Sequence, residues 1–407
     1  GAPLAELRAA VADSGGEWHA AAFLRQLRLL CRTGFVEYPL VESGRQLAVL
    51  VPQRASCVPA LAAQPLPDHW QLDSFACLRP ASGAWLLESP LCATRLRFAD
   101  LGALEGSLVR RALAAAGFLQ ETRPGKDSRG SAAQQWEFHD LLFHIHQRRG
   151  WHRDLLGAHL CFLGEIDPPP ARRPSWPGER ISLGRAPTDA GGESFASVLE
   201  RRRTVRQFDA RRPVALQELG WLLDRSFRIR SARTCTFTSM SGESASMQIA
   251  QRPYPSAGGI HELEIYPVVV RCEGLPSGLY HYDSWDHSLV GIPASEADVA
   301  RIAQDAQGAM GQTDCAPQII LAITARFTRM LWKYRSIGYA NILRDTGALY
   351  QTLYLVATEM GLAACGIGCG DSSLFADITG LDPLVEGTVG ECMIGRPERA
   401  EPETLST

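Results

Sequence analysis

The sequence contains only two lysines, Lys126 and Lys333, beside 39 arginines. An arginine stays protonated at any pH that a protein experiences, whereas the pKa of a buried lysine can fall until its amine is neutral. A lysine in a sequence that otherwise uses arginine for positive charge is therefore a candidate proton acceptor. Lys126 lies in a stretch rich in Pro, Gly and Ser, which predicts an exposed turn. For Lys333, which Tyr334 follows, a chemical role stays open.

A run of basic residues could hold an anion such as a phosphate group. Residues 201–208 read RRRTVRQF, so several arginines flank the hydroxyl of Thr204. An arginine fork binds phosphate through two parallel hydrogen bonds, and a hydroxyl adds another. A solvated basic stretch that caps a helix would have the same composition, so the run alone is not specific. The same holds for Arg396, which follows the last predicted strand.

Two glycine-rich segments could lie against a flat ligand. Residues 252–259 read RPYPSAGG, and small residues let a backbone approach a ligand closely. Residues 361–370 read GLAACGIGCG and could present backbone N–H groups to a ring nitrogen. The second segment follows a predicted helix instead of opening one, which argues against a dinucleotide-binding fingerprint. Both segments could also be ordinary turns, which Pro and Gly commonly mark. Cys365 and Cys369 could form a redox pair, but small residues beside a ligand explain the composition of residues 361–370 more simply.

The elements around these segments predict a mixed fold. In the second half of the chain we expect amphipathic helices, a long helix and apolar strands, over residues 195–202, 215–226, 341–360, 263–271, 318–326 and 391–394. Helices combined with a few apolar strands indicate an α+β or α/β sandwich. Residues 166–190 are rich in Pro, Arg and Gly, which predicts a linker. We therefore place a domain boundary there, between residues 1–165 and 191–407.

The first 165 residues show a weak internal repeat. A helix, a glycine and a hairpin are predicted twice, from residues 19–33, 35–41 and 47–51, and again from residues 104–116, 118–122 and 135–138. This is the outline of two winged-helix-like modules. Winged helices often bind DNA, but the formal net charge of −3 makes recognition of a peptide or a partner protein at least as good an interpretation.

Metal sites and disulfides are not expected. Five histidines fall between residues 139 and 159, and His144 and His146 on a strand could chelate a metal. The cluster has no recognisable ligand spacing, so we expect it to pack the first half against the second. The 11 cysteines contain no Cys-x-x-Cys pair, which argues against structural zinc and a disulfide framework. With no signal peptide and no bilayer-length apolar run, we expect a cytoplasmic protein with no nucleic-acid or membrane partner.

The basic run at 201–208, the glycine-rich segments at 252–259 and 361–370, and Arg396 follow one another along the chain. Taken together and in this order, they resemble the FMN-dependent nitroreductase superfamily over about residues 190–400. The sequence is most similar to the SagB-type dehydrogenases, which oxidise thiazolines and oxazolines in peptides to thiazoles and oxazoles. The likeness to this branch is carried by residues 252–259, by GLYHYD at 278–283, by DTG at 345–347 and by the pair Lys333–Tyr334.

The resemblance implies a cofactor and a set of site residues. FMN would be bound, with its phosphate or ribityl chain held by Arg202, Arg203, Thr204, Arg206 and Arg396. Its ring would be lined by Pro255, Ser256, Ala257, Gly258 and Gly259, and its edge by Gly366, Ile367, Gly368, Cys369 and Gly370. Lys333 and Tyr334 match the catalytic pair. Thr204 stands where the family commonly has serine, and it keeps the hydroxyl.

The resemblance also implies a fold and a function. It implies a homodimer of α+β sandwiches, each with a central, mostly antiparallel sheet flanked by helices and preceded by the two winged-helix-like modules. We expect Lys333 to act as the base, with its pKa lowered by Arg335 and Arg329. Dioxygen would be the final acceptor, and partner biosynthetic enzymes could act on the same substrate. The azoline could sit on a ribosomal peptide or on a carrier protein.

Two alternatives remain open. The first is an NAD(P)H-dependent nitro or quinone reductase, which would share the flavin-binding fold. The second is a winged-helix regulator in which the second half senses flavin without catalysis.

Overall fold

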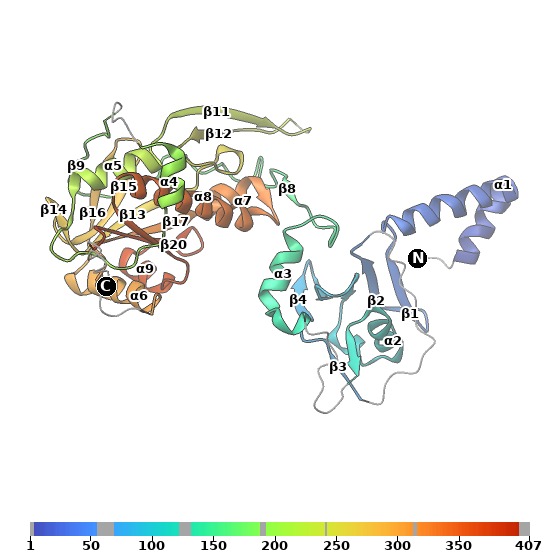
Figure 1. Cartoon of the computed structure of the whole chain (residues 1–407). Coiled ribbons are helices and arrows are strands. Elements are labelled where there is room, and N and C mark those ends of the chain that lie inside the picture. The colour runs from blue at the N-terminus through green and yellow to red at the C-terminus, as the bar shows by residue number, and fades with distance from the viewer. Residues whose placement is uncertain are drawn as a thin grey trace. The chain divides into compact units, whose positions relative to one another are not determined.

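The structure is a computed structural model, and it describes residues 4–54, 69–121, 132–187, 193–240, 242–311 and 316–398. The chain divides into two compact units, Gly1–Leu156 and Gly157–Thr407 (Figure 1). Lys126 lies outside the described residues, so the predicted turn around it is not tested.

The second unit is built on a seven-stranded sheet in which all neighbouring strands are antiparallel. In spatial order the strands are β19 (Ala363–Ile367), β20 (Glu386–Gly395), β17 (Ile319–Arg326), β13 (Leu263–Val269), β15 (Gly278–Asp283), β16 (Ser288–Ile292) and β9 (Arg180–Ser182). The predicted strands at 263–271, 318–326 and 391–394 are β13, β17 and part of β20. The prediction of a mostly antiparallel sheet is confirmed.

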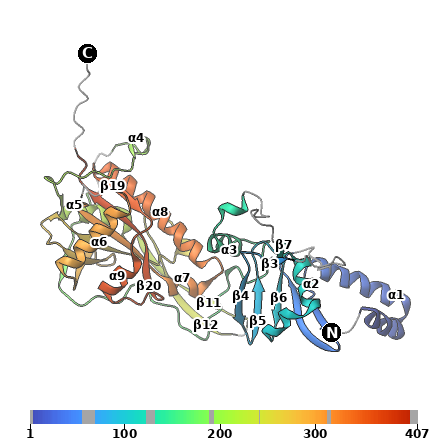
Figure 2. The ribbon, with the colours of Figure 1, turned by 90° about the horizontal axis from the view of Figure 1, so that it is seen from below.

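Helices cover both faces of this sheet, because the central strands are apolar on both sides. Ile319, Leu321 and Ile323 of β17 pack in one core with helices α5 (Leu216–Phe227) and α8 (Gly338–Glu359). The intervening Ile320 and Ala322 pack in a second core with α6 (Glu296–Gly308) and α9 (Ser372–Thr379). The ribbons show these helices beside the sheet (Figures 1 and 2). The α+β sandwich predicted from the sequence is therefore present.

Shorter elements carry the segments singled out in the sequence. Helix α4 (Phe195–Arg201) precedes the basic run, and the 3₁₀ turn η3 (Ala257–Gly259) lies within the first glycine-rich segment. Helix α7 (Phe327–Lys333) runs directly into β18 (Tyr334–Arg335), which pairs with β8 (Gly157–Ala158). Strand β10 (Val214–Ala215) pairs with β14 (Cys272–Glu273). A long hairpin of β11 (Ser231–Thr238) and β12 (Ser244–Gln251), which was not predicted, extends from this unit (Figure 1).

The first unit contains a five-stranded antiparallel sheet. Its order is β1 (Tyr38–Glu42), β2 (Arg45–Pro52), β6 (Thr94–Phe98), β5 (Ala84–Glu88) and β4 (Cys77–Ala81). The remaining elements are α1 (Leu4–Arg32), which is broken at Gly16, the 3₁₀ turns η1 (Leu101–Glu105) and η2 (Ala133–Gln135), α2 (Ser107–Ala116), α3 (Phe138–His146), and β3 (Trp70–Leu72), which pairs with β7 (Leu119–Glu121).

This arrangement corrects the prediction for the first half. The first helix and hairpin form, but β2 also pairs with β6, so the hairpin is part of a five-stranded sheet and not a separate wing. The second hairpin does not form, because β7 pairs with β3 and the strand expected at 135–138 is a 3₁₀ turn followed by the start of α3. Leu141 and Ile145 are buried against Phe75 at helical spacing, which the sequence reading missed. Tandem winged helices are thus not confirmed, and His144 and His146 lie on a helix.

Within the described ranges, none of the helices combines the length and apolar character needed to cross a bilayer.

Candidate functional site

The structure brings the predicted catalytic pair onto the first glycine-rich segment. Gly258 is exposed and has a φ of 63°, a left-handed conformation that favours glycine. A Cβ atom on Gly258 would lie 2.7 Å from Tyr334 Oη and 2.9 Å from Lys333 Nζ. The ends of both side chains therefore meet above a backbone that carries no side chain of its own.

The change from helix to strand at residue 333 positions this pair. Helix α7 ends at Lys333, and Tyr334 has the extended conformation of β18. The carbonyl of Lys333 accepts a hydrogen bond from the N–H of His159 at 3.0 Å, and Tyr334 pairs with Ala158. These backbone hydrogen bonds thus fix the positions from which the side chains of Lys333 and Tyr334 extend.

Lys333 lies in a half-buried, partly aromatic environment. Its Nζ is 5.3 Å from the ring centre of Phe237 and 5.4 Å from that of Tyr334. Burial lowers the pKa of Lys333, and the charge of nearby Cys235 opposes this to a smaller extent. The direction suits a lysine that has to become neutral in order to accept a proton.

The expected cause of the lowered pKa is wrong. Burial, and not the charge of Arg335 or Arg329, lowers the pKa of Lys333. Arg329 is fully buried and donates to backbone carbonyls of Pro169, Gln248 and Ile260. Arg335 lies with its guanidinium over a phenylalanine ring, 5.6 Å from the ring centre.

Two acidic residues that sequence reasoning did not assign to the site support the glycine-rich segment from behind. Both carboxylate oxygens of Asp345 accept a hydrogen bond from the N–H of Ala257, at 3.2 and 3.0 Å. Glu262 is fully buried and accepts from Ser256 Oγ at 3.4 Å. Burial and the charge of Asp345 raise the pKa of Glu262 to about 8. Burial and the charge of Asp345 also raise the pKa of Tyr334.

A tyrosine of α8 joins the basic run to the second glycine-rich segment. Tyr354 Oη lies 3.2 Å from Thr204 Oγ1 and accepts a hydrogen bond from the N–H of Gly366 at 2.8 Å. The guanidinium of Arg202 lies over the ring of Tyr354, 5.5 Å from its centre. The N–H of Val205 donates to the carbonyl of Ala364 at 3.1 Å. Nothing in the sequence distinguished Tyr354 from other residues of the long helix.

The arginines of the predicted phosphate site are placed differently. Arg203 and Arg206 are exposed, and Arg206 contacts the thiol of Cys365, whose pKa is raised by burial. Arg396 instead donates to Glu218 Oε2 at 2.6 Å. The backbone of Arg396 nevertheless lies beside the end of the basic run, since the N–H of Asp209 donates to the carbonyl of Arg396 at 2.8 Å and Phe208 pairs with Pro397.

The second glycine-rich segment leaves the sheet along its edge strand. A Cβ atom on Gly368 would meet no atom within 4 Å, so the backbone there faces open space. A Cβ atom on Gly370 would lie 2.5 Å from the carboxyl carbon of Glu391, so a side chain there would have to displace this carboxyl group. Burial raises the pKa of Glu391 to about 7. Cys365 is buried and Cys369 exposed, and both are free thiols.

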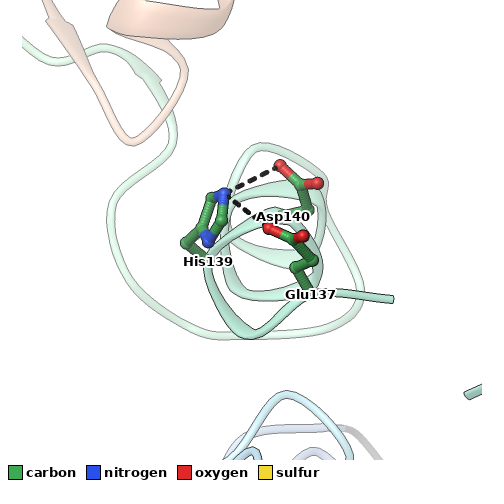
Figure 3. A group of neighbouring side chains, drawn as sticks. All are labelled: Glu137, His139 and Asp140. Carbon is green, nitrogen blue, oxygen red and sulfur yellow. Dashed lines mark ion pairs between the residues drawn. The ribbon is translucent and has the colours of Figure 1, made fainter. Parts of the chain in front are cut away.

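One group of potential metal ligands lies in the first unit. At the start of α3, His139 Nε2 is 3.4 Å from Glu137 Oε2 and 3.6 Å from Asp140 Oδ1 (Figure 3). All three side chains are exposed, and exposed acidic groups often adopt such arrangements without an ion. We therefore assign no metal to this group.

The second unit is similar to known proteins. Residues 199–396 match the model of the Nitroreductase family. These residues, just under half of the chain, are therefore similar to a nitroreductase family domain, and the match supports an oxidoreductase.

Two relatives and one solved structure illustrate the similarity. The "Putative nitroreductase MJ1384" of Methanocaldococcus jannaschii is 29% identical over 172 residues, which are 42% of this chain and 76% of the relative. The microcin B17-processing protein McbC of Escherichia coli is 29% identical over 116 residues, or 28% of this chain and 42% of McbC. A structure of the E. coli microcin synthetase McbBCD complex with truncated pro-MccB17 bound has a TM-score of 0.41 and 21% identity, covering 53% of this chain and 78% of that chain.

Proposed function

We propose that this chain is an FMN-dependent dehydrogenase that oxidises thiazoline or oxazoline rings of a peptide to thiazoles or oxazoles. The observation that carries the proposal is the meeting of Lys333 Nζ and Tyr334 Oη above Gly258. An amine with a lowered pKa beside a phenol is suited to removing a proton from a weak carbon acid. The similarity to a microcin-processing protein supports a substrate that is a peptide.

The described residues fit FMN. Arg202, Thr204 and the exposed Arg203 offer charged and neutral donors for a phosphate and a ribityl chain. At Gly258 and Gly368 a flat ring can approach the backbone, because no side chain covers it. Arg396 would have to leave Glu218 in order to join the phosphate site.

We assign the cofactor-binding role to the predicted residues. The phosphate and ribityl contacts are assigned to Arg202, Arg203, Thr204, Arg206 and Arg396. Contacts with the face of the ring are assigned to Pro255, Ser256, Ala257, Gly258 and Gly259. Contacts with its edge are assigned to Gly366, Ile367, Gly368, Cys369 and Gly370.

The chain's own residues supply the proton chemistry. Bound FMN supplies the acceptor for a hydride, and dioxygen is the proposed final acceptor of the electrons. The neutral amine of Lys333 takes the proton from the ring carbon next to the carbonyl. Tyr334 orients or relays that proton from its position beside Lys333. The azoline thus loses a proton and a hydride, two hydrogens in total, and becomes aromatic.

The proposed partners follow from the proposed substrate. We propose a homodimer that acts on a peptide, either ribosomal or bound to a carrier protein, together with other enzymes of the same pathway. Residues 1–165 are the proposed recognition region for the peptide or for those enzymes.

A second candidate is an NAD(P)H-dependent nitro or quinone reductase. The match to the Methanocaldococcus protein, whose name is that of a nitroreductase, favours it. Such an enzyme takes its hydride from NAD(P)H, so it needs no basic residue to deprotonate a carbon acid. The half-buried Lys333 beside Tyr334 therefore favours the dehydrogenase.

The test is mass spectrometry of a thiazoline-containing peptide after incubation with the protein, FMN and air. Wild type should remove two hydrogens from the peptide, and Lys333→Ala should leave it unchanged. Loss of two hydrogens at equal rates with both proteins would contradict the role of Lys333. NADPH oxidation with a quinone, and no change in the peptide, would support the reductase.

A further inference from the structure

Two carboxyl groups that are far apart in sequence meet behind the loop that faces Lys333 and Tyr334. Asp345, on α8, is 6% exposed, and Glu262, just before β13, is 0% exposed. Ser256 Oγ donates to Glu262, and the N–H of Ala257 donates to both oxygens of Asp345. Glu262 Oε1 is also buried, and none of the described residues donates a hydrogen bond to it.

Two buried carboxylates in contact cannot both be ionised without a large electrostatic cost. The pKa of Asp345 is raised by burial and lowered by hydrogen bonds, including one with Glu262. The pKa of Glu262 is raised by burial first and by the charge of Asp345 second. The pair therefore holds one proton at neutral pH, carried by Glu262, and one negative charge, centred on Asp345.

The surrounding charges do not neutralise this pair. Arg329 is the cation that acts on Glu262, but all its described hydrogen bonds are to backbone carbonyls. Arg344, on the same helix as Asp345, lowers the pKa of Asp345 by less than burial raises it. Tyr254 is fully buried, and its pKa is raised by burial, with smaller contributions from both carboxyl groups. Tyr334 is the half-exposed group on the active-site side that the charge of Asp345 reaches.

We propose that Asp345 and Glu262 are positioning residues that share one proton, fix the Ala257–Gly258 peptide and set the negative charge that Tyr334 experiences. The proposal rests on the proposed function, since the groups that it positions are the proposed catalytic pair. Asp345 holds the N–H of Ala257, and Gly258, the next residue, lies directly against Tyr334 and Lys333. Because Glu262 retains its proton at neutral pH, the pair of carboxyl groups carries one negative charge instead of two.

Substitution of the two carboxyl groups should affect the pKa of Tyr334 differently. Asp345→Asn removes the negative charge, so the pKa of the Tyr334 phenol should fall. Glu262→Gln keeps the charge of Asp345, which is the charge that raises the pKa of Tyr334, so that pKa should stay raised even though Glu262 itself ionises near pH 8. A purely structural role would weaken folding in both variants without this difference in their effects on the phenol.

The experiment is an ultraviolet titration of tyrosinate in the full-length chain with FMN, with Tyr334→Phe as the reference that isolates the Tyr334 signal. Asp224→Asn is the matched control, because Asp224 is also buried and also accepts from a backbone N–H, that of Ala186. We expect a lower midpoint in Asp345→Asn alone. An unchanged midpoint in Asp345→Asn, or an equal fall in Glu262→Gln, would overturn the proposal.

A second measurement does not depend on how well Asp345→Asn folds. The infrared spectrum of the wild type at neutral pH should contain a protonated carboxylic acid band from Glu262, beside that of Glu391 with its pKa of about 7, and the wild type minus Glu262→Gln difference spectrum should isolate the Glu262 band. Absence of that band would overturn the shared proton. Neither measurement requires turnover, so failure of azoline oxidation with both signals present would reject the proposed function and retain the carboxyl pair.

Discussion

Lys333 Nζ lies 2.9 Å from the position that a Cβ atom would occupy on Gly258. These residues are far apart in the sequence and belong to α7 and the η3 turn. A side chain at residue 258 would have to displace the ends of Lys333 and Tyr334, and the φ of 63° disfavours one in any case. The glycine is therefore required by both the backbone and the proposed catalytic pair.

Gly258→Ala should displace Lys333 and Tyr334 and reduce azoline oxidation on the order of 10²-fold, as expected for a misplaced catalytic group. The left-handed backbone should add a stability cost of about 1–2 kcal/mol. Steady-state kinetics and thermal unfolding measure the two effects separately. Gly308→Ala is the control, because a Cβ atom there meets no atom within 4 Å. Equal activity of Gly258→Ala and Gly308→Ala would contradict the described contact.

Lys333→Arg should be nearly as inactive as Lys333→Ala, because a guanidinium keeps its proton and cannot serve as the base. Loss of a general base costs typically 10²–10⁴-fold in rate. In the wild type, kcat/KM should rise with pH until Lys333 is neutral. Since burial lowers its pKa, this limb should lie below the pKa of about 10.4 of an unperturbed lysine.

The control for this series is Lys126→Arg, which changes the other lysine in the same way and should retain activity. An active Lys333→Arg with an unchanged pH profile would exclude proton transfer to this residue.

Tyr354→Phe should weaken FMN binding, because the hydroxyl holds both Thr204 and the N–H of Gly366. Loss of hydrogen bonds at a partly buried group should also cost about 1–2 kcal/mol of stability. Flavin fluorescence titration and thermal unfolding test these effects. Tyr280→Phe, which removes a hydrogen bond to the carbonyl of Pro276, should reduce stability and leave FMN affinity unchanged. Equal FMN affinities in both variants would contradict the role of Tyr354.

Glu262 should make stability depend on pH. Its pKa is raised on folding from 4.5 to about 8, so the folded state binds more protons than the unfolded state between these values. The free energy of unfolding should therefore fall as the pH rises from about 4.5 to about 8. Glu262→Gln should flatten this dependence, and Glu200→Gln on the exposed end of α4 should not. Denaturant unfolding at several pH values is the measurement, and parallel curves for wild type and Glu262→Gln would exclude a raised pKa.

The sequence predicts the centre of the second unit well, for a physical reason. Strands β13 and β17 are buried on both faces, so they appear as continuous apolar runs bounded by other elements. The long helix ends close to the predicted position, because Gly361 has a φ of 67°. By contrast, the β11–β12 hairpin is rich in Ser and Thr and mostly exposed, so no apolar pattern marks it.

The candidate site is predicted less completely, because many of its contacts are long-range. The glycine-rich segments and Lys333 were recognisable by residue type and order, and the structure brings Gly258 to Lys333. The pairing of Glu262 with Asp345, and the bridge from Tyr354 to Thr204, depend on how α8 packs on the sheet. Arg396 was placed with the other arginines by resemblance, but its partner here is Glu218.

The most direct test of the central claim is anaerobic mixing of the FMN-loaded protein with a thiazoline peptide, without NAD(P)H, while flavin absorbance is recorded. The peptide alone should bleach the flavin, and air should restore the colour. Lys333→Ala should slow the bleaching and leave the amount of bound flavin unchanged. Bleaching by NADPH, with no response to the peptide, would contradict the dehydrogenase and support the reductase.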